Sequence, residues 1–154
     1  MPLRFDAAEL QSYLDEVFPQ VRGLFVIDEV HEDHLKMRMP VKEAHLRPGG
    51  TVSGPSMFAL ADCGMYAAIL SHLGKEALAV TTNCAIDFMR KPEAGRDLYT
   101  ICRIHKLGRV LVVGDAMIYS DWVDKPVGPT MQAVLGCPVA LINDARAFTL
   151  AEAT

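Results

Sequence analysis

The stretch GGTVSGPSMFALADCGMYAAIL, residues 49–70, decides the fold of this chain. Its apolar side chains surround a helix instead of forming one stripe, which predicts a helix that is buried on most sides. Pro55 occupies a favoured first helical position, because its missing N–H is not needed there, and Gly74 is a typical helix end. We therefore expect a long buried helix from about Pro55 to Leu73.

One charged residue interrupts this apolar helix. Asp62 is the only Asp, Glu, Lys or Arg between Arg47 and Lys75. A carboxylate in such surroundings costs free energy unless it is paired or hydrogen-bonded, so Asp62 is the first candidate for a functional residue. The apolar run 57–70 also suggests a membrane span, but 14 residues are too few, and a central charge costs about 2.5–3.5 kcal/mol on insertion. We expect a buried helix of a globular protein instead.

Two extended runs precede the helix. GLFVIDEV (23–30) and HLKMRMPV (34–41) have the composition of β-strands and are joined by a short charged turn, which predicts a hairpin. Further upstream, the pattern Asp6-x-x-Glu9 resembles a capping box, and it predicts a short N-terminal helix that ends at Pro19.

The sequence after the helix changes from a helical to an extended period. Four runs have the pattern of strands: 78–90, 97–108, 109–121 and roughly 131–141. A buried helix followed by a meander of long antiparallel strands predicts an α+β fold in which the antiparallel sheet wraps around the central helix. With 154 residues, the chain should form a single domain, residues 1–154, with residues 1–20 as an N-terminal helical extension.

Composition argues against several kinds of partner and site. The net charge of −4, and basic clusters no longer than Arg90-Lys91, argue against nucleic-acid binding. The four cysteines have no CxxC or CxxH spacing, so we expect neither a zinc site nor a disulfide framework, and free thiols are typical of a reducing compartment. The first residues lack the apolar core of a signal peptide, and we expect a cytoplasmic protein. His31 and His34 flank two acids, but hairpin turns are usually charged, so we expect no metal and no cofactor.

Four short motifs follow one another along the chain in a characteristic order. They are LAD within the helix (60–62), F-x-R-x-P at a strand end (88–92), a glycine before a polar pair (95–97) and an LGR turn (107–109). In this order and spacing, over about residues 40–142, the chain resembles the hotdog-fold acyl-CoA thioesterases of the phenylacetate-pathway (PaaI-like) type. The resemblance implies a hotdog fold, hydrolysis of an acyl-CoA or acyl-carrier-protein thioester, coenzyme A only as part of the substrate, and a homodimer or homotetramer.

The same resemblance assigns catalytic roles to three residues. The family's carboxylate, which acts as nucleophile or general base, corresponds to Asp62. The backbone amide that polarises the thioester carbonyl corresponds to Gly54, and a hydroxyl that assists from the following strand corresponds to Thr81. The family's HGG triplet before the helix is replaced here by Ser53-Gly54-Pro55, which removes one potential amide donor.

Further residues are predicted to contact the substrate. Ser53 and Pro55 flank the catalytic glycine, Arg47 takes a position where related enzymes carry a polar amide, and Asn83 follows Thr81 on the same strand. Positive charge near strand ends is suited to the phosphates of coenzyme A, and the candidates for that role are Arg90, Lys91 and Arg109.

The spacing of Gly54 and Asp62 has a consequence for assembly. They are eight residues apart, which is about 12 Å along a helix, so one carbonyl cannot contact both groups of the same helix. If both act on one substrate they must come from different subunits, most simply across a two-fold axis.

Three alternatives stay open. A hotdog hydratase or dehydratase pairs a His with an acid, and Ser53 at the helix start counts against it. A non-catalytic acyl-CoA-binding or sensor protein fits the altered triplet. Asp62 also has a purely structural interpretation, as a carboxylate between two helices at a dimer interface.

Overall fold

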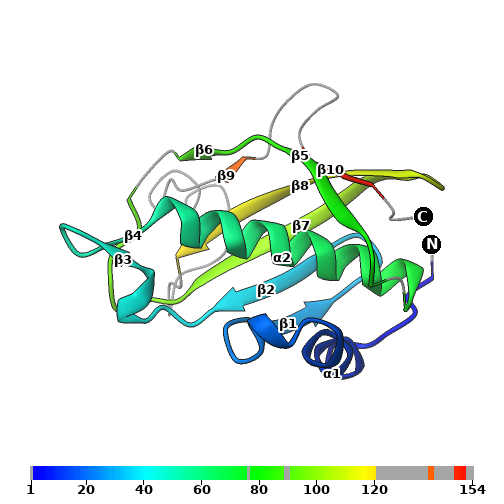
Figure 1. Ribbon diagram of the computed structural model, residues 1–154, viewed down its shortest axis with the longest axis horizontal. Helices are drawn as coiled ribbons and strands as arrows, with labels where there is room; N and C mark the ends of the chain where they lie inside the picture. Colours follow the sequence, from blue (N-terminus) through cyan, green and yellow to red (C-terminus); the bar gives the residue numbers. More distant parts are fainter. Residues whose placement is uncertain (1, 76, 89–90, 121–138, 141–147, 152–154) are drawn as a thin grey trace.

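The long helix α2 (Gly54–Leu73) forms the centre of the structure, a computed structural model that describes residues 2–75, 77–88, 91–120, 139–140 and 148–151 (Figure 1). Ser53 caps its start by accepting a hydrogen bond from the Ser56 amide, and Gly74 ends it with a φ of 86°, a conformation that glycine adopts without strain. The predicted bounds of this helix are confirmed. Twelve of its residues are buried: Met57, Leu60, Ala61, Cys63, Gly64, Met65, Ala67, Ala68, Ile69, Leu70, Ser71 and His72.

A six-stranded antiparallel sheet packs on α2, in the order β1-β2-β7-β8-β10-β5. The strands are β1 (Val26–Val30), β2 (Leu35–Met39), β7 (Leu98–Leu107), β8 (Leu111–Ser120), β10 (Phe148–Ala151) and β5 (Val80–Cys84). Two small antiparallel pairs lie outside this sheet: β3 (Leu46–Arg47) with β4 (Thr51–Val52), and β6 (Asp87–Phe88) with β9 (Val139–Ala140). An antiparallel sheet on one long central helix is the hotdog arrangement, so the predicted fold is confirmed.

Close contact between α2 and β7 depends on Gly64. A Cβ at this position would lie 2.6 Å from Thr100 Cγ2 and 2.8 Å from Cys102 Sγ, both on β7 and both fully buried. The missing side chain therefore allows the helix backbone to approach the sheet closely, which fixes the height of α2 above β7.

The N-terminal helix α1 (Ala7–Val17) covers one edge of this core beside β1. The predicted capping box is confirmed: the Glu9 amide donates to Asp6, and the Asp6 amide donates to the Glu9 carboxylate. Leu10 and Leu14 are buried on its inner face, and the chain turns at the short 3-10 helix Pro19–Val21. A second short 3-10 helix, Glu43–His45, precedes β3.

The strand order differs from the predicted meander. β5 does not pair with β7, the next long strand in the chain, but lies at the opposite edge of the sheet beside β10. The predicted strand 78–90 is interrupted after Cys84, and of the predicted strand 131–141 only residues 139–140 are described, as β9. A meander would place β5 next to β7, because β7 is the next long strand after it in the chain. In the structure β2 occupies that position instead.

The apolar run 57–70 is part of a longer helix, since α2 has 20 residues, so length alone does not argue against a membrane span. By length and composition, one helix among the described residues, Gly54–Leu73, could cross a membrane. In the fold, 67% of its most apolar window is buried, as in the core helix of a globular protein.

Candidate active site

The Asp62 side chain meets Thr81 where α2 passes under the edge strand β5. The Thr81 hydroxyl donates a hydrogen bond of 2.5 Å to Asp62 Oδ1, across 19 residues of sequence. This length is at the short end for a hydroxyl that donates to a carboxylate, so the bond is charge-assisted. One oxygen of the single carboxylate of α2 is thus hydrogen-bonded to Thr81 of β5, and the structure brings two of the residues predicted for the site into contact.

An open cavity of about 290 Å³ lies beside this pair. Its walls come from α1, α2 and the segment that leads into β5, and its lining residues are Val17, Phe18, Asp62, Cys63, Tyr66, Ala77, Ala79, Val80 and Thr81. Phe18 and Tyr66 meet edge to face with ring centroids 6.1 Å apart, and the Tyr66 hydroxyl donates to the Ala77 carbonyl at 2.7 Å. Asp62 and Thr81 therefore line a hollow whose other walls are mainly apolar, which is the usual character of a small-molecule site.

The start of α2 offers a second set of groups. Ser53 Oγ accepts from the Ser56 amide at 3.3 Å and shares a 2.8 Å hydrogen bond with Ser56 Oγ. Pro55 has no N–H, and the Met57 amide donates to the Ser53 carbonyl. Within the described part of the chain this leaves the Gly54 amide as the donor of the first helical turn, at the positive end of the helix dipole.

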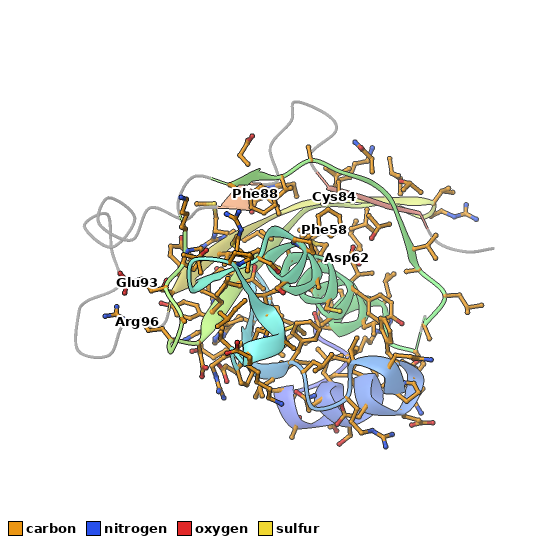
Figure 2. All side chains as sticks on the ribbon, turned by 60° about the vertical axis from the view of Figure 1, so that its left-hand side comes forward. Phe58, Asp62, Cys84, Phe88, Glu93 and Arg96 are labelled. Carbon is orange, nitrogen blue, oxygen red and sulfur yellow. The ribbon has the colours of Figure 1, made fainter. Side chains whose placement is uncertain are left out.

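Aromatic side chains that were not predicted from the sequence lie beside both sets of groups, those around Asp62 and those at the start of α2. Phe88 on β6 lies over Gly54, since a Cβ on that glycine would be 3.3 Å from Phe88 Cζ. Phe58, which is four residues from both Gly54 and Asp62, lies on the same face of α2 (Figure 2) and is 36% exposed. Helical spacing from Asp62 would have identified Phe58 and Tyr66, whereas Phe88 and Phe18 become neighbours only through the fold.

The cysteines near the site are poor nucleophiles. Burial, together with the negative charge of Asp62, raises the pKa of both Cys63 and Cys84 to about 12. A thiol with such a pKa stays protonated at neutral pH, and the thiolate is the reactive form. Of the described groups at this cavity, the Asp62 carboxylate is the one suited to attack or to accept a proton.

The predicted cationic residues do not gather in one place within a chain. Arg47 on β3 and Lys91 flank the loop that enters α2, where the Val52 amide donates to the Pro92 carbonyl at 3.0 Å. Arg109 lies in the turn between β7 and β8, beyond the other end of β7, roughly 30 Å along that ten-residue strand. All three side chains are exposed.

The remaining predicted site residues divide between the same two sets of groups. Ser53 and Pro55 stand at the start of α2, where Ser53 has a structural role as the helix cap. Asn83 is exposed on β5, two residues after Thr81. Arg90 lies outside the described residues. Gly54 and Asp62 are on one helix, about 12 Å apart by helical rise, so one chain does not bring both to a single carbonyl.

Comparisons with known proteins bear on this arrangement. A family model described as the thioesterase superfamily matches residues 49–124, which include the whole of α2 and β5. A protein of Deinococcus radiodurans that has the provisional name of an esterase is 30% identical over 110 residues, covering 71% of this chain and 68% of that protein.

Solved structures extend the similarity over nearly the whole chain. The crystal structure of a protein from Silicibacter sp. TM1040, provisionally named a thioesterase, is 51% identical with a TM-score of 0.76, covering 97% of this chain and 91% of that chain. A hypothetical thioesterase protein from Streptococcus pneumoniae TIGR4, solved with coenzyme A, is 19% identical with a TM-score of 0.61, covering 73% and 84%. The latter likeness supports the fold alone. The narrower resemblance to the phenylacetate-pathway type stays a prediction.

Proposed function

Because the chain belongs to the thioesterase superfamily, we propose that it hydrolyses an acyl-CoA thioester to a free carboxylic acid and coenzyme A. The observation that carries the proposal is the Asp62 carboxylate, held by Thr81 at 2.5 Å on the wall of a mainly apolar cavity. A thioester hydrolase needs such a group to attack the carbonyl or to activate water.

Asp62 can act in two ways, as a general base or as a nucleophile. As a general base, its free oxygen Oδ2 takes a proton from a water molecule whose oxygen attacks the thioester carbonyl. As a nucleophile, it attacks the carbonyl itself and forms a mixed anhydride, which water then hydrolyses. In both cases the C–S bond breaks, the coenzyme A thiolate takes up a proton, and the acyl group leaves as a carboxylate. Thr81 holds Oδ1 and thereby orients the carboxylate.

The developing oxyanion requires a donor, and the Gly54 amide is suited to that role. It belongs to the first turn of α2, where free amides and the helix dipole favour negative charge. Because Gly54 is about 12 Å from the Asp62 of its own helix, we assign it to the site of a second copy. Two antiparallel α2 helices side by side would create two equivalent sites.

Exposed apolar side chains support such a dimer. Phe58 on α2 and Val80 on β5 are 36% and 54% exposed, and Leu78 just before β5 is 70% exposed. β5 is also an edge strand of the six-stranded sheet, and a free edge tends to pair with another chain. A second copy that covers this face would bury the apolar side chains and place its helix start next to Asp62.

The two-fold arrangement also supports a coenzyme A site. Arg47 and Lys91 stand at the Gly54 end of the protomer. Arg109 lies at the other end of the protomer. Leu111, two residues after it, and Val80 of β5 both pair with Ala151 of β10. Antiparallel helices would bring the Arg47 and Lys91 end of one copy towards the Arg109 end of its partner. The Streptococcus pneumoniae relative solved with coenzyme A adds support for this substrate class.

The cavity suggests an acyl group of modest size. At about 290 Å³ it lies near the lower end of the range for small-molecule sites, roughly 300–1,000 Å³. Phe18 and Tyr66 close it with aromatic surface. We therefore assign short or aromatic acyl groups to the site. The free thiols of Cys63, Cys84 and Cys102 agree with a reducing compartment, for which we propose the cytoplasm.

Release of free thiol from a panel of acyl-CoAs tests the proposal. The wild-type chain is expected to turn over a short or aromatic acyl-CoA. Asp62→Asn keeps the size of the side chain but removes its basicity, and it should lower kcat/KM by about 10²–10⁴-fold. The matched control is Asp115→Asn, at an aspartate of β8 that contacts His105 of the neighbouring strand β7.

The rates of the two variants, together with acyl-CoA binding, distinguish a catalytic Asp62 from the alternatives. Full loss in Asp62→Asn with a wild-type rate in Asp115→Asn supports the assignment. Equal rates in Asp62→Asn and wild type would refute it. Tight binding of acyl-CoA by calorimetry, with no thiol release from any panel member, would favour the acyl-CoA-binding alternative.

A further inference from the structure

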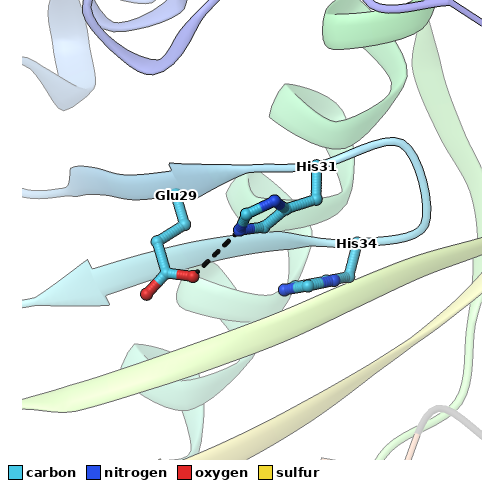
Figure 3. Close-up of side chains that lie close together, drawn as sticks. All are labelled: Glu29, His31 and His34. Carbon is cyan, nitrogen blue, oxygen red and sulfur yellow. Dashed lines mark hydrogen bonds and ion pairs between the residues drawn. The ribbon is translucent and has the colours of Figure 1, made fainter.

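The hairpin between β1 and β2 brings together a cluster that the proposed hydrolysis does not use: Glu29, His31 and His34 (Figure 3). The His31 amide donates to the His34 carbonyl at 2.9 Å, so the two histidines face each other across the turn. Their rings stack with centroids 4.5 Å apart, and His31 Nε2 lies 3.1 Å from Glu29 Oε2. Three side chains from 29–34 therefore share one patch of surface.

This cluster has the donor atoms of a transition-metal site. Two imidazole nitrogens and one carboxylate are a common protein ligand set for Zn²⁺, with further positions left to water. One ligand atom from each side chain can be chosen so that all lie within 4.8 Å of one another. Ligand atoms on a tetrahedral Zn²⁺ are about 3.3 Å apart, given bonds of about 2.0 Å. The ligand atoms must therefore move about 1.5 Å closer to one another, which rotation of exposed side chains achieves at small cost.

A fourth residue orients one of the candidate ligands. His34 Nδ1 lies 2.9 Å from the Asp33 carboxylate, which favours a proton on Nδ1 and leaves the Nε2 lone pair free for a metal. Metal-binding histidines commonly donate their second ring nitrogen to a carboxylate in this way, because it fixes the tautomer and the ring direction. Asp33 thus supplies a supporting contact of the kind that histidine ligands make in metal sites.

The charge of the cluster favours a cation. Glu29 supplies the carboxylate of the cluster, and its side chain is 47% exposed, so it can turn towards a bound ion. Lys36 Nζ is 3.7 Å from Glu29 Oε1, whereas His31 contacts Oε2. Lys36 also lies over the Tyr99 ring, 4.8 Å from its centroid, and can keep that position when Oε2 turns to a metal.

We propose that Glu29, His31 and His34 bind one divalent transition-metal ion of the Zn²⁺ class, with Asp33 orienting His34. The sequence showed only two histidines in a charged turn, and the structure adds the third ligand and the orienting carboxylate. A bound ion would join the end of β1 to the start of β2. Because it binds the folded hairpin, it would stabilise the native state by an amount that rises with the logarithm of its concentration.

Calorimetric titration of the full chain, without a polyhistidine tag, with ZnCl₂ tests the proposal and requires no substrate. The wild type is expected to bind one ion per chain at this cluster. His34→Gln and Glu29→Gln should each weaken the binding at least about tenfold, in line with the loss of one ligand. The matched control is His105→Gln, because His105 is also an exposed histidine beside a carboxylate, 2.6 Å from Asp115. It should bind as the wild type does.

The melting temperature gives a second readout. Zn²⁺ should raise it in the wild type and in His105→Gln, and much less in His34→Gln and Glu29→Gln, and EDTA should reverse the rise. Circular dichroism in the absence of metal checks that each variant is folded. Wild-type affinity in both cluster variants would overturn the proposal, as would the absence of binding to the wild type.

Discussion

Replacement of Thr81 by valine is a sharp test of how the Asp62 carboxylate is held. Valine keeps the shape of threonine and favours a strand, so β5 should retain its structure, but the hydroxyl that donates to Asp62 Oδ1 at 2.5 Å is lost. Hydrogen bonds to charged groups contribute about 1.5–3 kcal/mol. Thr81 is exposed, so water competes for the carboxylate and the lower figure applies. A loss of about 1.5 kcal/mol in the transition state lowers kcat/KM about tenfold.

The assay is thiol release from the best acyl-CoA of the panel, with kcat and KM measured separately. The fall should appear in kcat, because Thr81 orients the attacking group and does not bind the substrate's distant parts. Thr82→Val makes the same chemical change at the next residue of β5 and should leave the rate nearly unchanged. A wild-type rate in folded Thr81→Val protein, as judged by its melting temperature, would refute this role for Thr81.

Three further predictions concern packing, the cavity and the thiols. Gly114→Ala introduces a Cβ against the Arg103 carbonyl of the paired strand, so it should destabilise the fold by about 1–3 kcal/mol and lower the urea midpoint; an unchanged midpoint would contradict the packing. Ala79→Phe fills the cavity, so it should lower kcat/KM for aromatic acyl-CoAs more than for acetyl-CoA, and equal losses would argue against the cavity as the acyl site. Burial raises the pKa of Cys63 and Cys102 to about 12, so only about 10⁻⁴ of each is thiolate at pH 8. Iodoacetamide at pH 8 should therefore label both slowly in the native chain and rapidly in urea, as measured by mass spectrometry, and rapid native labelling would contradict their burial.

The central helix was predictable because local signals agreed with its burial. Pro55 and Gly74 mark its ends, and apolar residues on all sides require a surrounding sheet. Asp62 was identifiable for the same reason, since a single charge in such a helix needs a partner. The identity of that partner, Thr81, came from a family resemblance, and the structure supplied the contact.

The strand order was not predictable from periodicity. Alternation identifies a strand but not its neighbour, and the pairing of β5 with β10 joins residues about 65 positions apart. The cavity depends on the same long-range placement, because Phe18 reaches it only after α1 has packed beside the sheet. The proposed metal cluster has a different origin: His31 and His34 were recognised in the charged turn and no metal was expected there, whereas Glu29 and the stacking of the two rings are contacts that only the folded hairpin shows.

In the proposed mechanism, Asp62 of one copy and the Gly54 amide of another act on the same carbonyl. Gly54→Pro removes this amide, and Gly54→Ala is its control, because alanine brings a Cβ to the same place, 3.3 Å from Phe88 Cζ, but keeps the amide. Alone, Gly54→Pro should lower kcat by about 10²–10³-fold, as the loss of an oxyanion donor does.

Co-expression of Gly54→Pro with Asp62→Asn, each with its own affinity tag, tests whether one active site takes its groups from two copies of the chain. In a mixed dimer one of the two sites has both native groups, so a random mixture of the two inactive variants should recover about a quarter of the wild-type activity. The recovered rate should follow the amount of mixed dimer purified through both tags. A mixed dimer as inactive as its parents would contradict a site shared between two copies.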